Sequence, residues 1–150
     1  IVFGDWSSDV CSSDLIFSDF HLFDCLYGMR DVNPKEVNAL IRKMNLESKT
    51  IFNEGAFSRI DLSTGQRKRL ALIVTLLEDR PVYIFDEVAA DQDPQFRSFF
   101  YHDILGELRE RGKIVIVASH DAEYFDTADK VYRIDYGRIV DVMTTTRNVE

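Results

Sequence analysis

The stretch Val82-Tyr83-Ile84-Phe85-Asp86-Glu87 decides the fold, because four consecutive apolar residues end at two acids. A continuous apolar run of this length is typical of a strand buried on both faces of a parallel sheet. Arg80-Pro81 separates it from the preceding segment, since proline cannot continue a helix. We therefore expect a strand over residues 82–85 that carries its two acids to the end of a sheet.

A helix and a second apolar run follow this strand. Gln95 to Arg111 predicts a helix that is closed by Gly112 at its C-terminal cap. Ile114 to Ala118 predicts a second buried strand. A helix between two buried strands implies a parallel crossover connection.

Two further helices are predicted upstream. Asn33-Pro34-Lys35-Glu36 combines a cap residue, a proline at the first helical position and an early acid, and begins a short amphipathic helix. Ser63 and Gln66 have the spacing of a capping box and begin a helix that runs to about Glu78.

The two ends of the chain differ from its middle. Residues 1–15 repeat the unit Ser-Ser-Asp without helical or strand periodicity, and we expect them to form a loop. They resemble translated sequencing-adapter sequence at the broken end of a reading frame; a genuine polar segment is the alternative. Residues 131–142 predict a β-hairpin, and residues 143–150 predict a flexible tail.

Composition narrows the class of protein. A length of 150 residues corresponds to about one domain. The net charge of −8 is the wrong sign for a protein whose main partner is nucleic acid. No apolar run approaches the roughly 20 residues that a membrane helix needs. Cys11 and Cys25 form neither a CxxC pair nor a disulfide framework, which favours a reducing, cytoplasmic setting.

Three short motifs occur in a characteristic order. Leu62-Ser63-Thr64-Gly65-Gln66 begins a helix, the next strand ends at Asp86-Glu87, and the following strand ends at Ser119-His120-Asp121. In this order they resemble the signature helix, Walker B strand and switch histidine in the C-terminal half of an ATP-binding-cassette (ABC) ATPase. The resemblance covers residues 16–142. It implies an α/β, P-loop NTPase-like parallel sheet with flanking helices and a C-terminal β-hairpin, and ATP and Mg²⁺ as cofactors.

The predicted signature helix suits a phosphate. Ser63, Gly65 and Gln66 would present backbone N–H groups, a hydroxyl and the positive end of the helix dipole. The family usually has glycine where this chain has Thr64. In the family this surface closes over ATP held by a partner, so the resemblance implies a head-to-tail dimer of ATPase domains. For the cations at 67–69 we favour a solvated face over phosphate contact, because cations at a helix N-terminus oppose the dipole.

The resemblance also assigns roles to other residues. Asp86 would bind Mg²⁺ through water; Glu87 would polarise the attacking water; His120 would hydrogen-bond the γ-phosphate. Asp93 matches the D-loop acid that couples the two sites of the dimer, and it is equally suited to cap the following helix. Ser18 stands where the Q-loop usually has glutamine, and is too short to reach the metal directly.

A narrower resemblance concerns the run from Leu62 to Tyr101. Together with Ser18 it looks like the branch of exporters for cyclic peptides and siderophores. In that branch a transmembrane domain and the ATPase domain share one polypeptide at the cytoplasmic face of the bacterial inner membrane. This branch couples ATP hydrolysis to export.

The phosphate-binding loop of such enzymes, Gly-x-x-x-x-Gly-Lys-Ser/Thr, does not occur in the sequence. The one Gly-Lys pair, Gly112-Lys113, is followed by Ile114 and has Glu107 where the first glycine should stand. We therefore expect an N-terminally truncated domain that lacks its Walker A half and is inactive alone. We also expect the strand 82–85 to present an unpaired edge.

Three functions are compatible with these motifs. The first is a piece of an exporter ATPase. The second is an ATPase of the DNA-repair or chromosome-maintenance type, but these usually have glutamate at the position of Gln66 and carry a coiled-coil insertion. The third is a non-catalytic regulatory module that occludes a partner's nucleotide. The presence of Glu87 and His120 argues against the third.

Overall fold

The computed structural model describes residues 13–16, 25–26, 29 and 32–145. Its centre is a three-stranded parallel sheet in the order β1-β4-β5. These strands are β1 (Ser13–Ile16), β4 (Val82–Asp86) and β5 (Ile114–Ala118). Because β4 has a neighbour on each side, the expectation of an unpaired edge on 82–85 is wrong.

The loop expected over residues 1–15 is also wrong for residues 13–15, which lie in β1. Ser13 pairs with Val82 and Ile16 with Phe85. The sequence of this segment has no alternation of apolar and polar residues that would reveal a strand. By pairing with β4, this segment supplies hydrogen-bond partners for the backbone N–H and C=O groups of β4. Backbone groups need such partners whatever the side chains are.

One helical segment connects β4 to β5 and confirms the predicted parallel crossover. It consists of α3 (Pro94–Phe99), the π-helical turn η1 (Phe100–Ile104) and α4 (Leu105–Glu110). Gly112 follows with φ of 73°, a left-handed conformation that glycine adopts without strain. The π-helical turn was not predicted.

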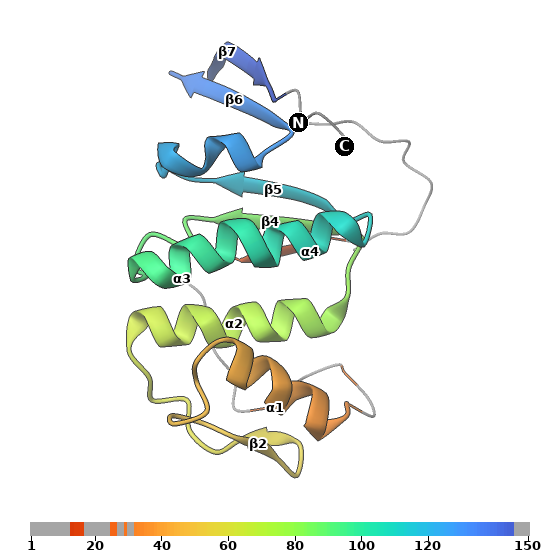
Figure 1. Cartoon of the computed structure of the whole chain (residues 1–150). Coiled ribbons are helices and arrows are strands. Elements are labelled where there is room, and N and C mark those ends of the chain that lie inside the picture. The colour runs from red at the N-terminus through yellow and green to blue at the C-terminus, as the bar shows by residue number, and fades with distance from the viewer. Residues whose placement is uncertain (1–12, 17–24, 27–28, 30–31, 146–150) are drawn as a thin grey trace.

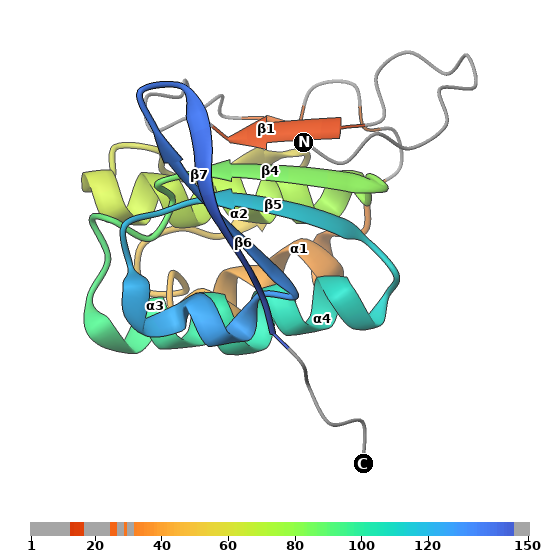
Figure 2. The same cartoon turned by 90° about the horizontal axis from the view of Figure 1, so that it is seen from above.

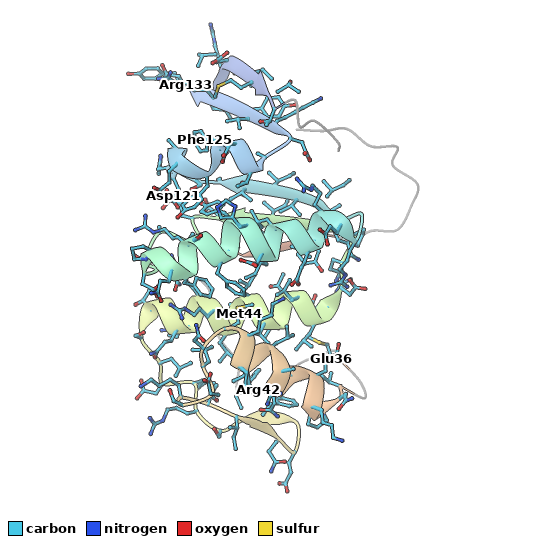
Figure 3. The ribbon with its side chains drawn as sticks, viewed as in Figure 1. Glu36, Arg42, Met44, Asp121, Phe125 and Arg133 are labelled. Atoms are coloured by element: carbon cyan, nitrogen blue, oxygen red, sulfur yellow. The ribbon has the colours of Figure 1, made fainter. Side chains whose placement is uncertain are left out.

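The predicted upstream helices are confirmed as α1 (Pro34–Lys43) and α2 (Thr64–Glu78). The Asn33 side chain caps α1 by accepting a hydrogen bond from the Lys35 amide at 3.0 Å. A small hairpin, β2 (Phe52–Asn53) and β3 (Ala56–Phe57), lies between the two helices in the chain and was not predicted. Met44, just after α1, faces α2 (Figure 3).

The helices α2 and α3–α4 lie on the same side of the sheet (Figures 1 and 2). Tyr83 and Phe85 point to that side and are completely buried. On the other side, Ile114 and Ile116 are 49% and 43% exposed. We expected these strands to be buried on both faces. In the described part of the chain the helices cover one face of the sheet and leave the other exposed, so this expectation is wrong.

After β5 the chain forms a 3₁₀ turn, η2 (Ala122–Thr127), and the predicted hairpin, here β6 (Lys130–Asp135) and β7 (Arg138–Thr144). β7 extends two residues beyond position 142, since Met143 and Thr144 pair with β6. Among the described residues, none of the helices has the length and apolar character needed to cross a membrane.

The sheet and helices share one functional end. The carboxyl ends of β4 and β5 and the N-termini of α2 and α3 lie together, on the left in Figure 1. This edge of a parallel sheet is where ligands bind in open α/β folds. Of the residues singled out from the sequence, those that the structure describes lie at this end: 63–66, 86, 87, 93 and 120.

Candidate functional site

Glu87 and His120 meet at the carboxyl ends of adjacent strands. Asp86 of β4 is in register with Ala118 of β5, so the residues that follow each strand are brought side by side. The Nε2 atom of His120 lies 3.0 Å from Oε1 of Glu87. The side chains are 93% and 41% exposed, so both are accessible to a ligand.

The backbone of Glu87 has an unusual conformation. Its φ is 49°, in the left-handed region that residues other than glycine seldom adopt. The Glu87 amide donates to the carbonyl of Ala118 at 3.0 Å. The turn after β4 is thus tied to the end of β5 through the same residue whose carboxylate meets His120.

A polar network supports the turn that carries His120. The hydroxyl of Tyr101 lies 2.6 Å from Oγ of Ser119 and donates to Oδ2 of Asp121 at 2.9 Å. Arg97 of α3 donates to Oδ1 of Asp121 at 3.3 Å. Asp121 lies beside α3 at the functional end of the molecule (Figure 3).

Burial raises the pKa of Tyr101 to about 12, opposed by the hydrogen bond with Ser119 and supported by the negative charge of Asp121. Tyr101 belongs to the π-helical turn, a distortion that often marks functional sites. Its role in this network was not predicted, because the sequence gives no sign of a change in helical pitch.

Asp86 ends β4 with a partly exposed side chain, next to the Glu87–His120 pair. A carboxylate is the ligand type that Mg²⁺ prefers, and Mg²⁺ commonly takes one or two carboxylates with waters and phosphates. No group of three His, Cys, Asp or Glu side chains able to hold a metal occurs among the described residues. A single carboxylate such as that of Asp86 is compatible with a Mg²⁺ ion that takes its other ligands from waters and phosphates.

The N-terminus of α2 carries the predicted capping box. Oγ of Ser63 accepts from the amide of Gln66 at 3.4 Å, and Oε1 of Gln66 accepts from the amide of Ser63 at 3.2 Å. Thr64 and Gly65 are the next residues of the first turn, where amides have no partner within the helix. This end can therefore offer two amides and the positive end of the dipole to an anion.

Gly65 is in close contact with the loop after β4. A Cβ atom at this position would lie 3.0 Å from the carbonyl oxygen of Asp91. Nε2 of Gln92 donates to the carbonyl of Gly65 at 2.9 Å. An open hollow of about 510 Å³ lies here, lined mainly by residues 63–66, Arg69 and residues 91–93. Within this chain, the glycine thus accommodates the loop.

The expectation of a solvated face at 67–69 is wrong for Lys68 and Arg69. Lys68 is 3% exposed and lies 2.6 Å from Oδ2 of Asp91. Arg69 donates to Oε1 of Gln92 at 2.8 Å and to Oδ2 of Asp93 at 2.5 Å. Burial of these cations is possible because acids and amides of the loop satisfy them. Arg67 alone is exposed, as expected.

Asp93 caps α3, one of its two expected roles. Its Oδ1 accepts from the amide of Phe96 at 2.9 Å. This hydrogen bond, aided by Arg69 and opposed by desolvation, lowers the pKa of Asp93. The remaining predicted residue, Ser18, lies outside the described residues.

Sequence reasoning missed Lys68, Gln92 and Tyr101. One signal for Lys68 was available: a cation near a helix N-terminus is locally unfavourable, which indicates a tertiary partner that compensates. Gln92 is buried, with Gly65 and Arg69 as its partners. Nothing in the sequence around Gln92 predicted that burial.

No protein-family model matches the chain. It is 43% identical over 129 residues to the ATP-binding protein SyrD of Pseudomonas syringae pv. syringae, a match that covers 83% of this chain and 23% of SyrD. It is 31% identical over 132 residues to the energy-coupling factor transporter ATP-binding protein EcfA1 of Mycoplasma mycoides subsp. mycoides SC, covering 85% of this chain and 31% of that relative.

A comparison with solved structures also finds a similar fold. The fold resembles that of a bacterial Atm1-family ABC exporter with ATP bound, with a TM-score of 0.69, 21% identity, and coverage of 89% of this chain and 25% of that chain. At this identity the likeness shows the fold alone. The fold is thus the expected mixed α/β arrangement of an ABC ATPase domain. In sequence and fold, the chain corresponds to part of an ABC transporter ATP-binding domain.

Proposed function

We propose that this chain supplies the water-activating carboxylate and the signature helix to an ATP-hydrolysing domain of an ABC transporter. The observation that carries the proposal is the 3.0 Å contact of Glu87 with His120 at the end of the sheet where α2 begins. Phosphoryl transfer depends mainly on positioning and on charge stabilisation. Two exposed side chains fixed at the ends of adjacent strands meet that requirement.

Glu87 would orient the attacking water and accept its proton. His120 would donate a hydrogen bond to the γ-phosphate, and its distance from Glu87 leaves the two groups able to act on one reacting centre. Asp86 would hold Mg²⁺ through water, and the metal would neutralise charge on the phosphates. Glu87 and His120 are therefore the catalytic residues of the proposal, and Asp86 is its metal ligand.

The start of α2 would bind ATP held by a second ATPase domain in a head-to-tail dimer. Ser63, Thr64, Gly65 and Gln66 occupy this start, and amides in the first helical turn suit a phosphate. Lys68 and Arg69 are engaged by loop acids, so amides rather than cations would make the phosphate contact. Asp93 would couple the two sites, as its match to the D-loop acid implies, while it also caps α3 and contacts Arg69 within this chain.

The transporter would be an exporter of a cyclic peptide or a siderophore. The support is the motif resemblance of residues 62–101, together with 43% identity to SyrD against 31% to EcfA1. The proposal places a transmembrane domain in the same polypeptide, at the cytoplasmic face of a bacterial inner membrane. The genomic sequence upstream of Ile16 tests it: a Walker A motif and six apolar spans support the proposal, and a coiled-coil or stand-alone gene overturns it.

Catalysis is tested in a chimaera in which the part of this chain that matches SyrD replaces the corresponding segment of SyrD. We expect ATP hydrolysis that Glu87→Gln abolishes, since the amide keeps the shape of the side chain but does not accept the proton. The matched control is Glu54→Gln, which changes an exposed acid in the turn between β2 and β3 and should leave the rate unchanged. Hydrolysis that survives Glu87→Gln would remove Glu87 from the mechanism.

A further inference from the structure

We propose that Lys68 is a positioning residue for Glu87: its buried ammonium holds the Glu87 carbonyl and the Asp91 carboxylate, and so fixes the turn that directs the Glu87 side chain toward His120. This inference rests on the proposed function for its effect on catalysis. Its structural part rests on contacts within this chain alone.

The left-handed backbone of Glu87 needs external support. A glutamate at φ of 49° is in a sparsely populated conformation, which persists where surrounding contacts determine it. Three hydrogen bonds do so here. The Glu87 amide donates to Ala118 at 3.0 Å, and the Glu87 carbonyl accepts from the amide of Ala90 at 3.2 Å and from Nζ of Lys68 at 3.1 Å. Only the last comes from a side chain.

Lys68 is suited to this task because it is buried and neutralised. It is 3% exposed, and the adjacent Asp91 carboxylate, 2.6 Å away, is 55% exposed. A buried ammonium must keep its hydrogen-bond acceptors, so its position is fixed by both of them. Lys68 therefore connects α2 to both the first residue of the loop and its fifth.

Arg69, the residue after Lys68, also attaches α2 to this loop. Arg69 contacts Gln92 and Asp93, which close the same loop. Consecutive residues of α2 thus hold the start and the end of the segment 87–93. Because Glu87 lies at the start, Lys68 is the one of the two that acts on the catalytic carboxylate.

Hydrogen exchange of the 150-residue chain tests the structural part of the proposal. In Lys68→Met the Glu87 amide is expected to exchange roughly tenfold faster, the change that loss of one charge-assisted hydrogen bond produces. Amides of Leu72 in α2 and Ile41 in α1 should exchange at the parent rate. Arg67→Met, which changes the exposed neighbour, should alter none of them. Unchanged exchange at Glu87 in Lys68→Met would overturn the proposal.

Asp91→Asn is a second variant. It keeps the shape of the loop and leaves the buried Lys68 side chain in place. It weakens the ion pair but leaves the bond from Lys68 to the Glu87 carbonyl, so the Glu87 amide should change by less than in Lys68→Met. An equal effect of both variants would mean that Lys68 acts through Asp91, which contradicts the proposal.

The effect of Lys68 on catalysis is tested in the SyrD chimaera. Lys68→Met should lower kcat about tenfold while KM for ATP stays unchanged, because Lys68 positions the catalytic group and does not contact nucleotide. A rise in KM with unchanged kcat would contradict a positioning role. If the unmodified chimaera hydrolyses no ATP, the proposed function fails, and the exchange experiment still decides whether Lys68 fixes Glu87.

Discussion

Replacing Gly65 by alanine is expected to destabilise the chain, although alanine favours helices. The added Cβ would lie 3.0 Å from the carbonyl oxygen of Asp91 and 3.5 Å from two side-chain atoms of Gln92. Overpacking of this kind costs about 1–3 kcal/mol. The higher helix propensity of alanine returns at most about 1 kcal/mol. The outcome depends on whether Asp91 can move away by a few tenths of an ångström.

The structure indicates that Asp91 cannot move freely. Its carboxylate is held by Lys68 at 2.6 Å, and the next residue, Gln92, is tied to the carbonyl of Gly65 and to Arg69. We therefore expect a net loss of about 1 kcal/mol. For a chain of this size that corresponds to a fall in Tm of roughly 2–4 °C, measurable by thermal unfolding followed by circular dichroism.

Gly106→Ala is the matched control for this prediction. Gly106 is also helical, in α4, but a Cβ there meets nothing within 4 Å. It should raise the free energy of unfolding by about 0.5–1 kcal/mol. In a Lys68→Met background the cost of Gly65→Ala should shrink, because the loop can then yield. An equal rise in Tm for both glycine substitutions would refute the argument.

Three further outcomes are expected. The 150-residue chain alone should release phosphate from millimolar ATP far more slowly than about 1 s⁻¹, an ordinary enzyme rate, which a steady-state phosphate assay checks. Tyr101→Phe should reduce the loss of folding stability at alkaline pH. The pKa of Tyr101 is about 12 in the folded state against an ordinary value of 10.0, so its contribution to the free energy of unfolding is complete below pH 10 and is lost between pH 10 and 12. Denaturant titrations of both proteins at several pH values check this. Ser63→Asp, in a chimaera trapped by Glu87→Gln, should keep its Tm because aspartate also caps helices, yet fail to form the ATP-dependent dimer in size-exclusion chromatography; a normal dimer would leave Ser63 as a cap alone.

Helix starts were predicted correctly because their signals are local. Asn33, Ser63 and Asp93 each accept a hydrogen bond from an amide two or three residues away, so the cap and its partner lie within one short stretch of sequence. The two strands of the crossover were equally clear from their apolar runs. The hairpin at 52–57 was missed because each of its strands has only two residues, too few to show a period.

The rest of the site depends on contacts that are distant in sequence. Lys68 meets residues 19 and 23 positions away, and Tyr101 meets Ser119 and Asp121 across the crossover. Both interactions depend on how helices pack on the sheet, and a single sequence contains no record of that packing. The exposure of Ile114 and Ile116 was missed for the same reason: an apolar run predicts a strand but not whether both of its faces are covered.

Contacts within this chain limit what the presence of residues 63–66 shows about phosphate binding. Ser63 and Gln66 are accounted for by the capping box, and Gly65 by the close approach of Asp91. Each of these residues therefore has a structural role here that would exist even if no nucleotide ever reached α2. Evidence for phosphate binding must come from a change that keeps these internal contacts and alters only what α2 offers to a ligand. Ser63→Asp meets that condition, since it preserves the cap while placing a negative charge beside the amides of the first turn.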